Sequence, residues 1–450
     1  MNIKKNGVLL PGLFLLTRVV SAQQQPAQSD SSQLARIEVQ EIVIMALEKS
    51  YDVELAKNTS FASNTDAKNA KGLFIPDFTL TGQRTKSEQK QHSEYDDRPS
   101  VDTKPKATNT QYGAQVTWTL FDGLKMFSTY KQLQNVAGVN QTLLTNQMAN
   151  TMASVIGNYY NIVAQKQQLK ALNEQISVAE ERIKLAERKL EVGSGIKTEW
   201  LQAKLDQNAF RTQVLQQEAA ILQTKANLNT LSGSQLPELF EVSDTIPLNL
   251  DLTIEEIFEG IEQSNPLLIA ARGNIEVAKF NLRARQGDRF PIINFISGLN
   301  GNQTENTVAP NPTSPRTQNG RNLNYGLSAT WFLSNNLVVT NAIQLARINL
   351  DRQEIIYEQQ KALAFNGVRI AFANYDNARK TLVIEEENVK FARENVSILL
   401  ESFKRGIATM IEVRTAQQSI VDAYNRLTTA RYNAKVSETE LLRLKGALLR

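Results

Sequence analysis

The chain has 450 residues, 41% hydrophobic and 21% charged, with no cysteine and a single histidine. This composition excludes a disulfide framework and a thiolate metal site, and it disfavours a metal or catalytic centre built on histidine. The formal charge is +4, but residues 1–22 carry Lys4, Lys5 and Arg18 and no acid, so the remainder carries 4 − 3 = +1 and gives no reason to expect nucleic acid as a partner.

Residues 1–22 have the organisation of a secretory signal peptide. Lys4 and Lys5 form a basic start, Val8–Leu16 is apolar, and Val20-Ser21-Ala22 offers a cleavage site of small residues. A membrane anchor is disfavoured, because a spanning helix needs roughly 18–20 apolar residues. Gln23 and not cysteine follows the expected cleavage site, so we expect an exported protein without a lipid anchor.

Helical periodicity begins at Leu34 and continues to about Lys71, with an expected break near Ser50. Phe74-Ile75-Pro76 ends this run, because proline lacks an amide hydrogen and restrains the residue before it. Alternation over residues 75–82 then predicts a first strand, followed by a polar loop to residue 110.

Residues 111–121 carry the clearest strand pattern, because Tyr112, Ala114, Val116, Trp118 and Leu120 alternate with polar or small residues. Period two indicates one apolar and one polar face, and aromatic residues at both ends of the apolar row are typical of strands that face lipid. Residues 324–333 repeat the pattern. We therefore expect these side chains to face lipid: Tyr112, Val116, Trp118, Leu120, Tyr325, Leu327, Trp331 and Leu333.

A long helix is predicted from Leu124 to Val192, because apolar residues recur at steps of three and four and no proline interrupts them. Glycines break it in a turn over residues 190–197, and a second helix is predicted from Thr198 to Leu231. Residues 236–250 form a linker between the two halves.

The second half repeats this plan. A helix is predicted over Thr253–Gln286, then a strand over 291–299, a polar loop over 300–321, a strand over 324–333, a long helix to Arg405, a turn over 404–409 and a last helix to Leu449. Tyr112 and Tyr325, Trp118 and Trp331, Gly193 and Gly406, and Glu199 and Glu412 share an offset of about 213 residues. This offset predicts a duplication with repeats over 23–235 and 251–450.

The predicted strands cannot complete a membrane structure in one chain. An open sheet leaves unpaired amides in hydrocarbon, and closed single-chain barrels begin at about eight strands. Four strands per chain therefore require association, with eight strands from two copies or twelve from three. Each long helix would reach about 100 Å, which suits the wall of a tall cylinder.

These features together resemble the TolC-like outer-membrane efflux proteins over nearly the whole mature chain. The resemblance is carried by the duplication, by Phe290-Pro291 before a strand, by Leu120-Phe121-Asp122-Gly123 after one, and by the glycine turns at Gly193 and Gly406 followed by Glu199 and Glu412. Asn265-Pro266 also matches the family, whereas Tyr51-Asp52 stands at its counterpart in the first half.

The resemblance implies a mainly helical fold with a membrane β-barrel: a homotrimer whose twelve-helix α-barrel continues into a twelve-stranded β-barrel. It implies a passive duct in the outer membrane of a diderm bacterium that reaches into the periplasm and exports small toxic compounds. The implied partners are a periplasmic adaptor, an inner-membrane pump of the RND or ABC type, and outer-membrane lipid. A duct for polypeptide (type I) secretion and a non-transporting structural coiled coil remain as alternatives.

Site residues follow from the same resemblance. Glu412 stands where the family often has an acid lining the closed periplasmic entrance, whereas Thr415 replaces a second acid. Glu199 is the equivalent in the first half, and Phe403 replaces a common hydroxyl-bearing partner. A solvated helix glutamate is the alternative for Glu412. The residues expected to meet the adaptor at the two turns are Lys189, Gly193, Ser194, Gly195, Ile196, Lys404, Arg405, Gly406, Ile407 and Ala408.

No pattern in the chain predicts catalysis or a cofactor. His92, Glu94, Asp96 and Asp97 lie together in an acidic loop, but one histidine among exposed acids is weak evidence for a metal site. No glycine-rich phosphate loop with a Lys-Ser/Thr ending is present, so nucleotide energy would have to come from a partner. We therefore expect no enzyme activity, no cofactor and no metal.

Overall fold

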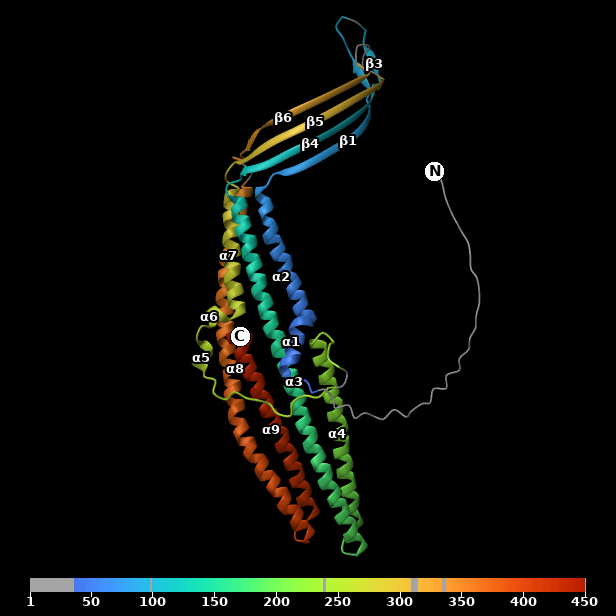
Figure 1. Ribbon diagram of the computed structural model, residues 1–450, viewed down its shortest axis with the longest axis vertical. Coiled ribbons are helices and arrows are strands. Elements are labelled where there is room, and N and C mark those ends of the chain that lie inside the picture. Colours follow the sequence, from blue (N-terminus) through green and yellow to red (C-terminus); the bar gives the residue numbers. More distant parts are fainter. Residues whose placement is uncertain (1–35, 98, 238–239, 309–314, 334–336, 450) are drawn as a thin grey trace, which may run out of the picture.

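The computed structural model describes residues 36–97, 99–237, 240–308, 315–333 and 337–449. The expected signal peptide over residues 1–22 and its cleavage site lie outside these ranges. The molecule is a tall bundle of long helices with a slanted sheet at one end (Figure 1).

In the first half, the chain breaks at Ser50, whose extended backbone (φ −60°, ψ 132°) separates two helices near the position expected. Asp122 follows the sheet, and its carboxylate accepts from the amide of Met126 at 2.9 Å in the first turn of the long helix. The helical elements are α1 (Val39–Lys49), α2 (Tyr51–Asn69), the short 3-10 helix η1 (Ala70–Phe74), α3 (Lys125–Glu191) and α4 (Lys197–Leu231).

In the second half, the expected continuous helix over 253–286 is wrong. Gly260 adopts φ +71°, and Asn265-Pro266 starts a new helix in which the Asn265 side chain accepts from the amides of Leu267 and Leu268. Proline is favoured at a first helical position because no amide partner is needed there. The helices are α5 (Ile254–Phe258), α6 (Ile261–Ser264), α7 (Pro266–Gly287), α8 (Val338–Lys404) and α9 (Met410–Lys445).

Four long strands form an antiparallel sheet in the order β1-β4-β5-β6, and β2 pairs with β3 in a small separate hairpin. The strands are β1 (Asp77–Glu88), β2 (Gln91–Ser93), β3 (Val101–Thr103), β4 (Lys106–Phe121), β5 (Ile292–Val308) and β6 (Thr317–Thr330). They are longer than the strands expected at 75–82, 111–121, 291–299 and 324–333, so the polar loops expected over 82–110 and 300–321 are wrong in large part. Backbone pairing continues where both faces become polar, and apolar alternation alone does not detect such extensions.

The pairing register separates an apolar from a polar face. Directly opposed residues share a face, so the apolar face holds the rows Phe78–Val116–Ser297–Tyr325 and Leu80–Ala114–Leu299–Leu323. The polar face holds the rows Thr81–Gly113–Asn300–Asn322 and Gln83–Gln111–Asn302–Gly320. The side chains expected to face lipid on Tyr112, Val116, Tyr325 and Leu327 lie together on the apolar face.

Three of the residues expected in lipid-facing strand positions are placed differently. Leu120 lies at a register shift between Thr119 and Phe121, so Phe121 and not Leu120 stands opposite Ile293. Trp331 and Leu333 follow the end of β6 at Thr330. A bulge inserts one residue and reverses the alternation beyond it, which a period-two pattern cannot reveal.

Trp118 and Trp331, the tryptophans of the two strand motifs, make equivalent hydrogen bonds where the sheet meets the helices. The indole N–H of Trp118 donates to the carbonyl oxygen of Phe74 at 3.0 Å, and that of Trp331 donates to the carbonyl oxygen of Arg289 at 3.1 Å. Phe74 and Arg289 each lie just before a strand, β1 and β5. The two halves therefore enter the sheet through equivalent contacts.

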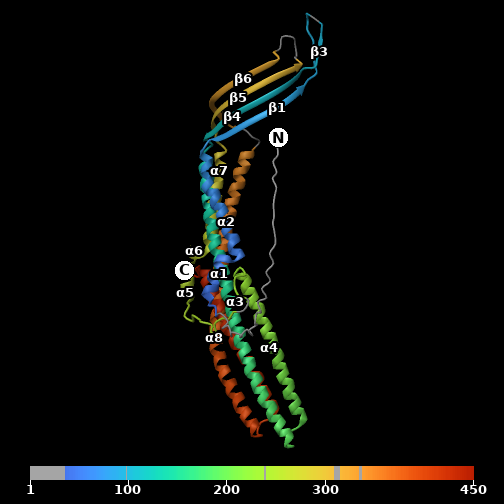
Figure 2. The same cartoon turned by 45° about the vertical axis from the view of Figure 1, so that its right-hand side comes forward.

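The helices form a wall four helices wide. Helix α3 packs on α2 and α7 in the half nearer the sheet and on α4 and α9 in the other half, and α8 packs on α7 and then α9. Figures 1 and 2 show the shorter helices stacked end to end beside the two long ones. The open edges of the wall are therefore α8 on one side and α2 with α4 on the other.

The main apolar core lies where the stacked helices meet, and the linker covers it. Tyr159 of α3 is 1% exposed; its hydroxyl donates to the carbonyl oxygen of Ile37 at 3.1 Å and accepts from the amide of Ser243 at 2.9 Å. Phe240 and Val242 of the linker join this core. Among the described helices, none has the length and sustained hydropathy to cross a bilayer.

Candidate functional site

The turn between α3 and α4 and the turn between α8 and α9 lie together at the end of the bundle away from the sheet, as both views show (Figures 1 and 2). The Lys189 ammonium joins them, because it donates to the carbonyl oxygen of Phe403 at 3.3 Å and lies 4.0 Å from the centre of the Phe403 ring. The fold therefore brings the two sets of predicted adaptor-contact residues to one place.

Each turn closes its helix with a left-handed glycine. Gly193 has φ +75°, and the carbonyl oxygen of Lys189 accepts from the amides of Ser194 at 2.9 Å and Gly195 at 2.8 Å. Gly195 is also required sterically, because a Cβ there would lie 2.8 Å from the Cβ of Lys189. Such bonds satisfy carbonyl groups that a helix end leaves free.

The second turn repeats this geometry. Gly406 has φ +77°, and the carbonyl oxygen of Ser402 accepts from the amides of Ile407 at 2.9 Å and Ala408 at 3.3 Å. The basic residues here have acidic neighbours: Lys404 lies 3.8 Å from Glu181, and Arg405 lies 3.4 Å from Glu401.

Large aliphatic side chains are exposed at the paired turns. Val192 and Ile196 of the first turn are 77% and 61% exposed. Ile407 of the second turn and Ile411 at the start of α9 are 78% and 74% exposed. Large aliphatic side chains at this exposure are a common sign of a contact surface when they gather in one patch. The family resemblance predicted adaptor contact for Ile196 and Ile407 but not for Val192 and Ile411.

Glu412 is bound within its own turn. One carboxylate oxygen accepts from the amide of Thr409 at 2.6 Å and from its hydroxyl at 2.8 Å, and the Thr409 hydroxyl accepts from the amide of Glu412 at 3.3 Å. This reciprocal pair is a capping box at the start of α9. The hydrogen bond from the Thr409 amide, followed by that from its hydroxyl, holds the pKa of Glu412 below its ordinary value.

The other residues expected at the entrance have separate roles. Phe403 is 2% exposed and packs with Met410 and Val413, so it is a core residue. The Thr415 hydroxyl donates to the carbonyl oxygen of Ile411 at 2.9 Å. Glu199 lies in the first turn of α4, and its carboxylate contacts no hydrogen-bond donor among the residues that the structure describes. The structure therefore does not bring Glu199 and Phe403 together as a polar pair.

A buried arginine that sequence analysis missed lies next to this entrance. Arg182 of α3 is 1% exposed, and its guanidinium donates to Asp206 of α4 at 3.1 Å, to the side-chain oxygen of Gln417 of α9, and to the sulfur of Met410 at 2.9 Å. Arg414 of α9 also lies 3.4 Å from Asp206. Burial lowers the pKa of Arg182, and the bond to Asp206 opposes this effect.

The buried arginine contacts side chains of two other helices, and removing Asp206 would leave its guanidinium buried without a carboxylate partner. It could have been detected in the sequence, because Arg182 interrupts the apolar stripe of Ala179, Ile183 and Ala186. A hollow of about 350 Å³ opens beside it, lined by Arg182, Asp206, Arg414 and Thr415 among others.

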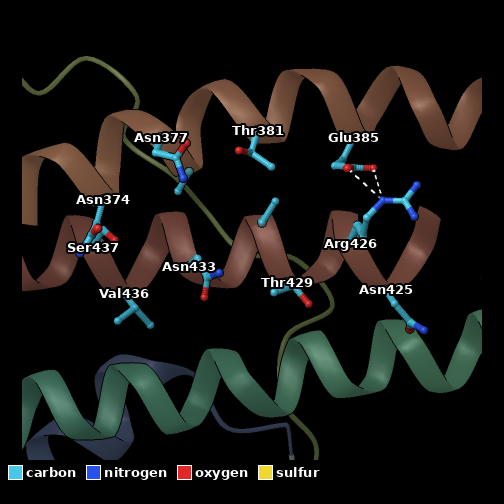
Figure 3. Close-up of a pocket in the computed structure, with 12 residues that line it drawn as sticks. Asn374, Asn377, Thr381, Glu385, Asn425, Arg426, Thr429, Asn433, Val436 and Ser437 are labelled. Carbon is cyan, nitrogen blue, oxygen red and sulfur yellow. Dashed lines mark hydrogen bonds and ion pairs between the residues drawn. The ribbon is translucent and has the colours of Figure 1, made fainter. Parts of the chain in front are cut away.

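A second hollow of about 620 Å³ runs between α8 and α9 (Figure 3). Its lining is rich in uncharged side chains such as Asn374, Asn377 and Thr381 of α8 and Asn433 of α9, with one ion pair in which Arg426 Nε lies 3.0 and 3.1 Å from the two oxygens of Glu385. The linker passes behind the two helices in this view, so the hollow lies on the opposite face.

His92 of the acidic segment pairs with a carboxylate. Its Nδ1 lies 2.7 Å from Asp102, directly across the β2–β3 hairpin. This contact holds the hairpin at the far end of the sheet, and it gives His92 an ordinary structural role.

Comparison with known proteins gives a consistent result. A family described as "Outer membrane efflux protein" has a sequence model that matches residues 43–234 and 259–447. The chain is 21% identical over 342 residues to the outer membrane efflux protein BepC of Brucella suis, covering 76% of this chain and 73% of BepC. It is also 21% identical over 348 residues to the alkaline protease secretion protein AprF of Pseudomonas aeruginosa, covering 73% of this chain and 68% of AprF. In fold it resembles the outer-membrane channel OprN, with a TM-score of 0.75 at 16% identity over 91% of this chain and 90% of OprN.

Proposed function

Because the chain belongs to the outer membrane efflux protein family, and so to the outer membrane, we propose that three copies form one passive export duct. The duct carries small toxic compounds outward from a periplasmic adaptor and an inner-membrane pump of the RND or ABC type. It combines a twelve-stranded barrel with a twelve-helix tunnel. One observation carries this proposal. In a single copy, the sheet and the helix wall each end at two edges without a neighbour, and the two edges of each could pair with one another.

The sheet edges are compatible with a closed ring. Strands β1 and β6 each pair on one side only, and the four strands alternate in direction. An even number of alternating strands places β6 of one copy antiparallel to β1 of the next. Three copies then give twelve strands without an edge, which removes the unpaired amides that hydrocarbon does not tolerate.

The helix edges are equally unpartnered in one copy. On α8, Ile370, Ile384, Phe391 and Ile398 are 54–61% exposed and recur at multiples of seven residues on the side turned from α9. On α4, Leu201, Leu215 and Leu222 are 45–66% exposed and recur in the same way on the side turned from α3. Seven-residue apolar spacing is the pattern of helices that pack along their length. We infer that α8 of one copy packs on α4 of the next.

The contact between the two halves of one copy supports the same arrangement. At the offset of about 213 residues, Ile384 and Ile398 of α8 correspond to Ala171 and Leu185 of α3. Ala171 is buried, and Leu185 packs in the cluster that contains Met410 and Val413 of α9. The α3–α9 contact within a copy would thus recur as an α8–α4 contact between copies, just as the β4–β5 pairing would recur between β6 and β1.

The inner surface of this duct would be polar with few charges. The polar sheet face carries amides and hydroxyls, such as Gln111, Asn300 and Asn322, and the amide-rich hollow between α8 and α9 lies on the face opposite the linker. With the linker on the outside, this hollow faces the tunnel. Such a lining suits solutes of varied structure, since it offers hydrogen bonds without selecting one charge.

A polypeptide secretion duct is the second candidate, and the similarity to the alkaline protease secretion protein AprF favours it. The same barrel and tunnel could serve drug efflux or polypeptide secretion. The two functions would then differ in the pump and adaptor that bind the tip. Co-purification of the chain from its own bacterium with its adaptor and pump distinguishes them: a drug pump supports efflux, and a dedicated peptide exporter supports secretion.

One experiment tests the duct itself. Protein purified in mild detergent should run as a heat-resistant trimer and should give discrete single-channel conductance in a planar bilayer. A water-soluble monomer without conductance would contradict the proposal.

The tip glycines give a specific prediction about the adaptor. A Cβ added to Gly193 or Gly406 would have no neighbouring atom within 4 Å, so replacing both glycines with leucine costs only backbone strain, about 1–2 kcal/mol each. The added side chains would stand where an adaptor must approach. We expect the double variant to form trimers but to lose export of toxic dyes from cells.

Gly260 provides the matched control, because it has φ +71° and equally open surroundings far from the tip. The Gly260→Leu variant should keep both trimers and export. Normal export by the tip variant would contradict adaptor contact through these turns.

The capping box gives a prediction about pH. A carboxylate ring at the entrance favours cations, and we infer that three copies of Glu412 form it. Since Thr409 holds the pKa of Glu412 below its ordinary value of 4.5, the ring stays charged, and cation preference persists, as the pH falls toward that value. Thr409→Ala removes the hydroxyl bond and raises this pKa, so preference should be lost at a higher pH than in the wild type.

Reversal potentials across a salt gradient, measured at a series of pH values from 7 to 3.5, give the midpoint pH at which cation preference is lost. Glu412→Gln should have little cation preference at any pH. A wild-type preference that survives in Glu412→Gln would show that other groups select the ions, and equal midpoints in wild type and Thr409→Ala would contradict the role of the cap.

A further inference from the structure

On the polar face of the sheet, the side chain of Asn300 lies flat across its own strand, β5. Its oxygen covers Gly113 of the neighbouring strand β4, because a Cβ added to that glycine would lie 2.5 Å from this oxygen. Its nitrogen points to the other side, where it donates to the side-chain oxygen of Asn324 of β6 at 3.4 Å. The amide therefore spans from one neighbouring strand to the other and does not stand upright on the sheet.

A second asparagine covers a glycine in the next row of the same face. Asn302 of β5 lies over Gly320 of β6 so closely that a Cβ on this glycine would overlap the side-chain oxygen. Other glycines of the sheet lack such a cover: a Cβ on Gly82 or Gly326 would have no neighbouring atom within 4 Å. Covering an asparagine is therefore a property of particular glycines, and it leaves both Gly113 and Gly320 half-buried.

The strand backbone itself does not require glycine at these two positions. Gly113 and Gly320 lie within β4 and β6, and neither has a left-handed φ. Alanine could therefore adopt the same backbone without strain. Its Cβ would instead displace the asparagine, because a carbon and an oxygen that are not bonded stay roughly 3.3 Å apart. The glycines thus make room for the asparagines.

A displaced asparagine would have to stand away from the sheet. On its other side each asparagine has a further amide side chain, since Asn322 stands opposite Asn300 and Gln111 stands opposite Asn302. The free space lies above them, in a hollow of about 650 Å³ that these four side chains help to line. An upright amide would reach about 2 Å farther into this space, by the lengths of its Cβ–Cγ and Cγ–O bonds.

We propose that the two asparagine–glycine pairs set the widest solute that the barrel admits. The inference rests on the proposed trimer, in which the polar face lines the lumen. Two pairs in each of three copies place six amides flat against the wall, where they keep the lumen wide and carry no charge. The barrel therefore selects solutes by their width, and Asn300 and Asn302 with Gly113 and Gly320 determine this limit.

A single thiol in the lumen measures the width. The chain has no cysteine, so Thr79→Cys introduces the only thiol. Thr79 is exposed on the polar face, one row nearer the helices than Asn300. Maleimides that carry polyethylene glycol of graded length are added to intact cells from outside. The longest polymer that labels the thiol in this parent variant gives the width that the barrel admits.

Gly113→Ala/Gly320→Ala, made in the parent variant, should shift this limit to shorter polymers. The longest polymers that label the parent should no longer react, whereas the shortest should react as before. Adding Asn300→Ala/Asn302→Ala should restore the parent limit, because no amide is left to displace. An unchanged limit in the glycine variant, or no recovery when the asparagines are removed, would overturn the proposal.

Gly301→Ala is the matched control on the opposite face of the sheet. Tyr112 covers Gly301 as the asparagines cover their glycines, since a Cβ on Gly301 would overlap the Tyr112 ring. The displaced ring would move toward lipid and not into the lumen. This variant should therefore keep the parent limit. A limit as short as that of the Gly113/Gly320 variant would trace the effect to a general disturbance of the sheet and would overturn the proposal.

The parent variant separates this proposal from the duct. Equal labelling by polymers of every length would show that no enclosed lumen exists, and the duct would fail together with the width limit. A clear limit in the parent that the Gly113/Gly320 variant leaves unchanged would overturn the role of the asparagine–glycine pairs alone, because an enclosed lumen is then present.

Discussion

Replacing Ile384 and Ile398 with glutamate is expected to leave the protein monomeric. Both side chains are more than half exposed in one copy and lie on the edge of α8 that we infer to pack on α4 of the next copy. Two substitutions place six carboxylates in the three seams of a trimer. Each buried carboxylate without a partner costs several kcal/mol, which far exceeds what surrounding contacts can offset.

Size-exclusion chromatography with light scattering measures the result directly, and the monomer should also lack conductance. The control is Asn425→Glu/Asn433→Glu, which adds the same charges to exposed positions of α9, a helix inside the wall. It should remain trimeric. Stable trimers of the Ile384/Ile398 variant would contradict the helix seam and leave the sheet as the only junction.

The sequence predicted the plan of the molecule because its signals are local and repeated. Apolar residues at steps of three and four predict the long helices, period-two patterns predict the strands, and the glycines at 193 and 406 predict both turns. The shared offset could also be read without a structure. These features depend on residues close in the chain, where periodicity is a direct consequence of backbone geometry.

What the sequence could not predict depends on contacts between distant segments. The strands continue through polar residues such as Arg84 and Asn302 because their backbones pair, and no side-chain pattern requires it. The bulge at Leu120 and the end of β6 before Trp331 are likewise set by partner strands.

At the periplasmic entrance, too, contacts between distant segments could not be predicted from the sequence. Glu412 was expected to line the entrance because of its position in the family pattern. In the structure its carboxylate binds Thr409, three residues earlier, and the two residues form a capping box that the sequence could have shown. Arg182 could be singled out in the sequence because it interrupts an apolar stripe. Its partners on α4 and α9 are brought to it by helix packing and could not be predicted.

This buried arginine leads to the second large expected effect. Asp206→Ala should destabilise the tip by about 3–5 kcal/mol, the usual cost of leaving one member of a buried ion pair without its partner. Arg182 would keep only Gln417 and the sulfur of Met410 as acceptors. Because the pair joins α3 to α4 and α9, the loss should appear as faster amide hydrogen exchange in these helices near the turns, by about 10²–10⁴-fold.

Two variants identify the cause of this effect. Glu180→Ala removes a nearby carboxylate of α3 that pairs with Arg211 at 3.9 Å on the surface and accepts from the side-chain amide of Gln207 at 3.2 Å. It leaves no buried charge without a partner, so it should change exchange by less than about tenfold. Arg182→Met/Asp206→Leu replaces the pair with apolar side chains of similar size and should restore slow exchange, because no charge is left buried. If the double variant exchanges as fast as Asp206→Ala, shape and not charge holds the helices together. In that case the tip would open when packing is disturbed, and a change of charge alone would not open it.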